Sequence, residues 1–166
     1  MEPKMLTFDE VRAKVEALKT KNGVDLSNEE DLSIAVMNLI SIEEHSFFTG
    51  VKTQKDDYFV VLQEARALRG KLLGKMIEKT EGETWCLSKH LLATSMRLME
   101  VGTKLNGQGK LAEAKEMFEA SYRMYSLFFA LRLKVVEPST AKEMVKADKA
   151  WTVDDIVTKL VDCCNE

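Results

Sequence analysis

Apolar residues recur at intervals of three and four positions through most of this chain, the spacing that gathers them on one side of an α-helix. The pattern is clearest over residues 83–135, where two amphipathic segments are separated by Asn106-Gly107-Gln108-Gly109. Glycine commonly ends a helix because it adopts the left-handed backbone conformation without steric strain. The segment therefore predicts an antiparallel hairpin of two helices.

Helix starts elsewhere are indicated by a Ser or Thr followed three residues later by an acidic residue, a pattern known as a capping box. Ser27 with Glu30 and Thr53 with Asp56 are two such pairs, and Gly50 between them should end a helix. Together with the hairpin, these signals predict four long helices, at about 28–49, 54–79, 83–106 and 110–135.

Shorter helices are predicted at both ends of the chain. Thr7 and Glu10 form another capping box, which opens a helix that should end near Gly23. Pro138 should end the last long helix, since the residue before a proline is pushed out of the helical region of backbone space. Two short helices are then expected, at about 140–149 and 153–164.

Four long helices with short connections favour an up-down arrangement, because short connections make consecutive helices antiparallel neighbours. We therefore expect an all-α fold, an up-down four-helix bundle of long antiparallel helices with a short N-terminal helix and two short C-terminal helices. A length of 166 residues is that of one domain. Residues 1–166 are expected to form a single helical domain, with the core bundle at about 27–136 and a C-terminal helical appendage at 138–166.

Composition and charge limit the classes of partner that we expect for this chain. The formal net charge of −3 gives no bulk attraction to nucleic acid or to an anionic membrane, although it leaves room for a local basic patch. No run of apolar residues approaches the roughly 20 needed to cross a bilayer. The three cysteines, Cys86, Cys163 and Cys164, do not make a disulfide framework. We expect a soluble cytoplasmic protein with no membrane partner, and nucleic acid is not favoured.

Glu44 is the most unusual residue of the predicted apolar stripes. The stripe of residues 28–49 is expected to face the bundle interior and consists of Leu32, Val36, Met37, Ile40, Glu44, Phe47 and Phe48. A buried carboxylate must be paired, protonated or bound to a metal, because an isolated buried charge is costly. A ferritin-like di-metal site needs Glu-x-x-His motifs, and this sequence has none. We therefore expect Glu44 to pair with an arginine such as Arg66, Arg69 or Arg97, and we predict no metal and no cofactor.

Cys86 and His90 are a second candidate pair. Four residues apart on a helix, they can face the same way and could supply two zinc ligands, or a nucleophile with its base. A structural zinc site needs four ligands, and the sequence has no Cys-x-x-Cys and no local catalytic signature. A packed thiol beside a half-buried histidine is the simpler interpretation.

Two further segments are similar to known motifs. Gly102, Gly109, Ala114, Phe118 and Ser121 stand at the spacings of one tetratricopeptide repeat, and this resemblance implies a peptide-binding scaffold. The register is not repeated in residues 28–79, and small residues at such positions also let any two helices pack closely. The run from Gly70 to Lys75 is similar to a phosphate-binding loop, but it is one residue short, lacks the Ser or Thr after its lysine and lies inside a predicted helix, so we do not assign it as one.

The C-terminal segment needs something to pack against. Ile156, Val157, Leu160 and Val161 would share one side of a helix capped by Thr152. A helix of about 13 residues is marginal alone in water. It should therefore dock either on its own bundle or on a second copy or partner.

Two classes of function follow. The favoured one is a non-enzymatic protein-interaction or structural module, with a protein partner or self-association. The alternative is a small helical enzyme or metal-binding bundle using Glu44, His45, Cys86 and His90. The candidate binding residues are Glu44, His45, Arg69, His90 and Arg97.

Overall fold

The computed structural model describes residues 13, 16–17 and 26–134 of the chain. Within them lie the helices α2 (Leu26–Thr53), α3 (Asp57–Met76), α4 (Glu83–Gly107) and α5 (Leu111–Arg132), and a single 3₁₀ turn, η1 (Lys79–Glu81). The described residues contain no strand, so the prediction of an all-helical chain with four long helices is confirmed. The remainder of the predicted N-terminal helix, both predicted C-terminal helices, Cys163 and Cys164 lie outside the described residues.

The first predicted boundary is wrong by one helical turn. Gly50 lies inside α2, and a Cβ at this position would come within 3.0 Å of the Phe59 ring, so the glycine makes room for α3. Thr53 does not cap α3, because its hydroxyl donates to the carbonyl of Thr49 at 2.7 Å and the N-cap residue is Asp56. The predicted stop is therefore a site of close helix contact.

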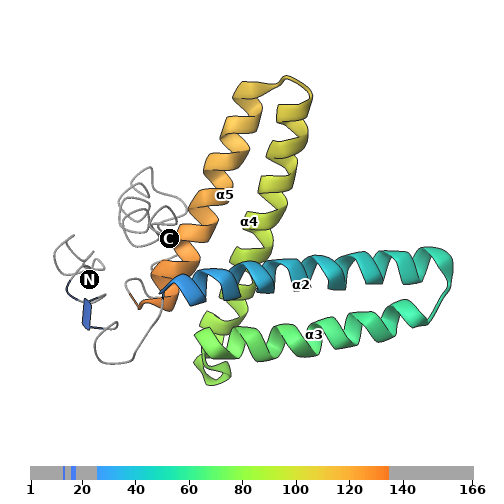
Figure 1. The fold of residues 1–166 in the computed structure, drawn as a ribbon, viewed down its shortest axis with the longest axis horizontal. Helices are drawn as coiled ribbons and strands as arrows, with labels where there is room; N and C mark the ends of the chain where they lie inside the picture. The colour runs from blue at the N-terminus through green and yellow to red at the C-terminus, as the bar shows by residue number, and fades with distance from the viewer. Residues whose placement is uncertain (1–12, 14–15, 18–25, 135–166) are drawn as a thin grey trace.

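Four helices form two antiparallel hairpins that cross each other (Figure 1). Helix α2 packs along α3, and α4 packs along α5, whereas α2 meets α4 over a short stretch only. The α4–α5 turn is the one predicted from its glycines: Gly109 has φ +75° and the Lys110 amide donates to the Leu105 carbonyl at 3.0 Å. The finer expectation of an up-down bundle, with all four helices side by side, is not confirmed.

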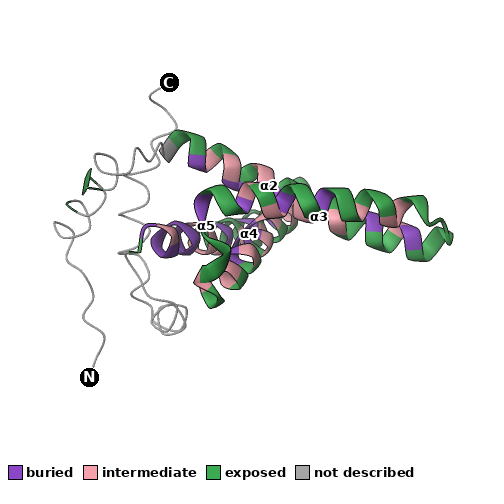
Figure 2. Ribbon diagram, turned by 90° about the horizontal axis from the view of Figure 1, so that it is seen from below, coloured by how far each residue is buried: buried purple, intermediate pink, exposed green. Residues whose placement is uncertain are grey.

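The hydrophobic core lies where the hairpins cross. It draws on the first half of α2 and α4 and on the last part of α3 and α5, through Val36, Met37, Leu73, Met76, Ile77, Leu91, Leu92, Leu127, Phe128, Phe129, Ala130 and Leu131. The tip of the α2–α3 hairpin is mostly exposed (Figure 2). Because the core sits near one end of each hairpin, both hairpins extend beyond it as arms.

Polar contacts between α2 and α5 fix the crossing. The hydroxyls of Ser33 and Tyr125 are 2.7 Å apart, and the Ser33 hydroxyl also lies 2.6 Å from the Glu30 carbonyl, to which it can donate. Arg132 Nη2 donates to Glu29 Oε1 at 2.5 Å, and both side chains are largely buried. Ion pairs of this kind resist separation, since breaking one would leave a charge without its partner in a dry site.

Small residues let α4 and α5 approach closely. Ser88, Ser95 and Gly102 are spaced by seven residues and are all buried. The Ser95 hydroxyl donates to the Ser121 carbonyl at 3.0 Å, and the Ser121 hydroxyl donates to the Ser95 carbonyl at 2.7 Å. A Cβ at Gly102 would come within 2.6 Å of the Phe118 ring. Close packing within one hairpin therefore accounts for the small residues that resemble a tetratricopeptide repeat.

Candidate functional site: the corner between the hairpins

The adjacent acidic residues of α2 form ion pairs with two different helices. Arg69 of α3 donates to both carboxylate oxygens of Glu43, with Nη2 at 3.3 Å from Oε2, and the Arg69 side chain is only 8% exposed. Arg97 of α4 donates to Glu44 and also to Glu100, and these three side chains are exposed or half-buried. The structure thus links Glu44 to Arg97 across the hairpins and encloses Arg69 within the first hairpin.

The expectation that Glu44 lies inside the bundle is wrong. Its side chain is 43% exposed, and the largely buried carboxylate that pairs with an arginine belongs to its neighbour Glu43. Pairing of Glu44 with one of the expected arginines, Arg97, is confirmed. Because α4 crosses α2 instead of running along it, only the first half of the α2 stripe is covered.

The remaining candidate residues lie at the surface. His45 on α2, and Cys86 and His90 on α4, are all exposed. No three His, Cys, Asp or Glu side chains are grouped to hold a metal ion within residues 13, 16–17 and 26–134. Among the described residues, no hydrogen bond joins the Cys86 thiol to a histidine.

Beyond the crossing, the apolar stripe of α2 continues on the surface. Phe47, Phe48 and Val51 follow Glu44 by three, four and seven residues, so they lie on the side of α2 that meets α4. They are 47%, 61% and 49% exposed, although the first two were expected to be core residues. The two phenyl rings pack edge to face, with centroids 5.2 Å apart.

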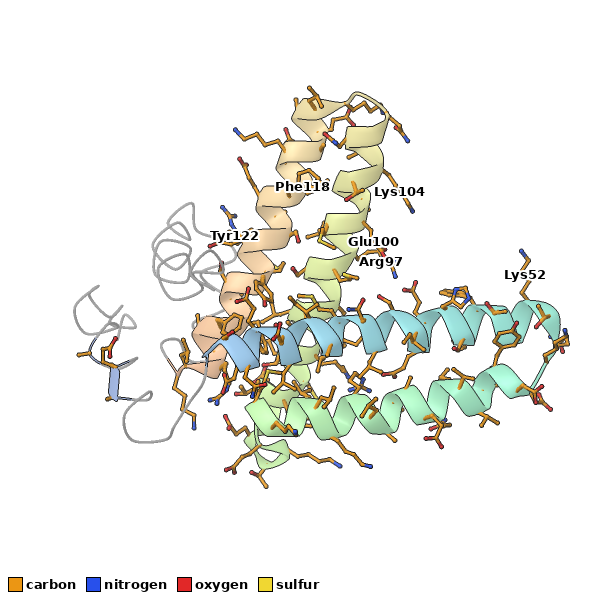
Figure 3. All side chains as sticks on the ribbon, in the orientation of Figure 1. Lys52, Arg97, Glu100, Lys104, Phe118 and Tyr122 are labelled. Atoms are coloured by element: carbon orange, nitrogen blue, oxygen red, sulfur yellow. The ribbon has the colours of Figure 1, made fainter. Side chains whose placement is uncertain are left out.

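Helix α4 supplies the other side of the same corner. Glu100, Val101 and Lys104 follow Arg97 by three, four and seven residues and continue the side of α4 that meets α2. Figure 3 shows Arg97, Glu100 and Lys104 projecting from α4 on the side of the α2 arm, and Lys52 projecting from that arm. We call the following residues the corner surface: Phe47, Phe48, Val51, Lys52, Arg97, Glu100, Val101 and Lys104.

The charges of the corner surface are unevenly matched. Arg97 forms ion pairs with both Glu44 and Glu100, so the carboxylates where α2 meets α4 already have a cationic partner. Lys52 and Lys104 are exposed, and among the described residues neither takes part in an ion pair. The corner surface therefore combines an exposed apolar stripe with two lysines that are not neutralised by the residues described.

Sequence reasoning missed this surface because it assigned the whole stripe to the interior. Helix α2 has 28 residues, which at 1.5 Å per residue is about 42 Å. A helix that crosses another is covered over about 10 Å only, the width of its neighbour. The length of the stripe could have indicated exposure only if the crossing had been known.

No helix of the described residues is both long and apolar enough to span a lipid bilayer. Comparison with known proteins adds no relative, since the chain matches no protein-family model, no curated protein and no solved structure.

Proposed function

We propose that this chain is a helical protein-interaction module that binds an amphipathic helix on the corner surface. The proposal is carried by one observation. Phe47, Phe48 and Val51 are exposed, although the same side of α2 is buried in the core nearer the N-terminus of the helix. An aligned apolar stripe beside polar residues is the surface on which helical partners dock through anchors at positions i, i+3, i+4 and i+7.

The size of the stripe favours a single helix over a globular domain. A fully exposed phenylalanine offers about 150–250 Å², so Phe47, Phe48 and Val51 at half exposure present roughly 300 Å². A specific interface between two globular proteins buries about 800 Å² on each partner, of which about 450 Å² is apolar. A short helix lying in the angle between α2 and α4 would match the smaller area while touching both arms.

An enzyme or metal-binding bundle is the other class of function. It would require Glu44, His45, Cys86 and His90 to act together, but Glu44 is held by Arg97 and the other three are exposed. No specific observation favours this second class, and we do not propose it.

The proposal is tested by the binding of a designed helical peptide to the full chain, followed by fluorescence anisotropy. The peptide carries leucines at i, i+3, i+4 and i+7 and glutamates elsewhere, and a second version carries lysines in place of the glutamates. Because Lys52 and Lys104 flank the apolar residues, we expect the glutamate peptide to bind about tenfold more tightly than the lysine peptide.

The double substitution Phe48→Ser/Val51→Ser should weaken binding of the glutamate peptide at least tenfold, since it removes the central apolar contacts. Val60→Ser is the matched control, because Val60 is also exposed but lies on α3. Equal binding by both variants would refute the proposed function.

A further inference from the structure

We infer that the occupant of the corner surface is this chain's own segment 152–164, which docks there as an acidic amphipathic helix. The inference rests on the proposed function, because it needs the corner surface to bind a helix. The segment lies outside the described residues, and the inference is supported by its sequence and by the position of the last described residue.

The segment has the chemistry that the corner surface accepts. Ile156, Val157, Leu160 and Val161 share one side when the sequence is helical, and they offer the apolar anchors. Residues 152–164 contain three aspartates and one lysine, a net charge of −2. Lys52 and Lys104, which have no ion pair among the described residues, supply the opposite sign. Attraction between these charges acts over about 10 Å at moderate salt, so direct contact is not required.

The tether is long enough to reach the corner surface. The described chain ends at Lys134, directly after α5, and 17 residues, 135–151, separate it from Thr152. Fully extended, they span about 56 Å, and with residues 140–149 helical, as the sequence predicts, they still span about 38 Å. Tyr125 of α5 contacts Ser33 of α2. The nine residues from Tyr125 to Lys134 cover about 14 Å and the 18 residues from Ser33 to Val51 about 27 Å, and the straight line from Lys134 to Val51 is shorter than this path of about 41 Å because the helices cross.

Other occupants and other surfaces fit less well. A second copy would need to bury about 800 Å² per partner, of which about 450 Å² is apolar, and the stripe offers roughly 300 Å² of apolar side chain. Val61 and Leu68 are also exposed, but both belong to α3, so a helix docked on them would touch a single helix. Tethering further favours the chain's own segment, since a short tether gives an effective concentration of about 1 mM.

Hydrogen exchange of the full chain, followed by mass spectrometry, tests the inference. If the untethered contact has a Kd of about 0.1 mM, an effective concentration of about 1 mM keeps the segment docked about ten to one. The amides of 152–164 should then exchange about tenfold more slowly than in an unstructured peptide. Phe48→Ser/Val51→Ser should abolish this protection, and the control Val60→Ser should leave it unchanged.

Charge reversal gives a second, independent readout. Lys52→Glu/Lys104→Glu should lower the protection to about threefold, because the acidic segment then meets like charges. Adding Asp154→Lys/Asp162→Lys to that variant should restore it, since the signs are exchanged on both sides. A purely structural role of the lysines would not be rescued in this way.

Three results would overturn the inference: exchange of the wild-type segment at the unstructured rate, protection that no corner variant alters, or protection lost on dilution together with a dimeric mass. Each leaves the proposed function standing if the glutamate peptide still binds in a Phe48-dependent manner. Conversely, failure of that peptide to bind even the Asp154→Lys/Asp162→Lys chain would refute the proposed function itself.

Discussion

Glu43 and Glu44 are neighbours in the sequence, yet their carboxylates form ion pairs with different hairpins. Glu43 turns toward α3 and forms an ion pair with Arg69, and both of these side chains are largely buried. Glu44 turns toward α4 and meets Arg97 at the surface. One ion pair therefore closes the first hairpin, and the other joins the two hairpins where they cross.

Replacing each of the two glutamates by glutamine should reveal, in the free energy of unfolding, how differently the two ion pairs are buried. Glu43→Gln should lower the free energy of unfolding by about 2–4 kcal/mol, because it leaves the Arg69 guanidinium without an anion in a mostly dry site. Glu44→Gln should cost less than about 1 kcal/mol, because its pair with Arg97 is half exposed. Urea unfolding followed by circular dichroism measures both, and equal costs would contradict the assigned orientations.

Two helical glycines should respond to alanine with opposite signs. A Cβ at Gly70 would meet no atom within 4 Å, so Gly70→Ala should raise stability by up to about 1 kcal/mol through helix propensity. At Gly102 a Cβ would lie 2.6 Å from the Phe118 ring and 3.2 Å from the Ala114 carbonyl oxygen. Gly102→Ala should therefore destabilise by about 1–2 kcal/mol. Thermal unfolding compares them, and a stabilising Gly102→Ala would show that α4 and α5 are further apart.

The buried serines of α5 offer another contrast. Ser121 donates to the Ser95 carbonyl, so Ser121→Ala should cost about 1 kcal/mol for the lost hydrogen bond. The Ser126 hydroxyl is fully buried and has no partner among the described residues. Ser126→Ala should be neutral or stabilising by up to about 1 kcal/mol, since an unsatisfied polar group is removed. Chemical denaturation midpoints provide the comparison, and a large loss for Ser126→Ala would indicate a bound water or other partner.

Two phenylalanines, one in the core and one on the corner surface, should differ most in the stability lost when each is replaced by alanine. Phe128 is fully buried in the core, so Phe128→Ala should cost about 3–5 kcal/mol. Phe48 is 61% exposed, and Phe48→Ala should cost less than about 1 kcal/mol. If Phe48→Ala instead destabilises as strongly as Phe128→Ala, the arm of α2 is buried in the folded protein and the corner surface does not exist as described.

The candidate site was only partly accessible from the sequence. Spacing placed Glu44 on an apolar stripe and suggested an arginine partner, and Arg97 fills that role. Spacing could not distinguish the side of α2 that faces α3 from the side that faces α4, so the buried carboxylate was assigned to Glu44 instead of Glu43. It also gave no reason to single out Lys52 or Lys104, because exposed lysines are ordinary on helices.

The sequence by itself determined that four long helices form and where the α4–α5 turn lies. Those features depend on apolar periodicity and on Gly109 at a positive φ, which are properties of neighbouring residues along the chain. Only the tertiary structure decided that the hairpins cross, and hence that Met37 is buried while Phe48, on the same stripe, is exposed. Burial of a stripe depends on which distant helix packs against each of its turns, and local spacing carries no information about that choice.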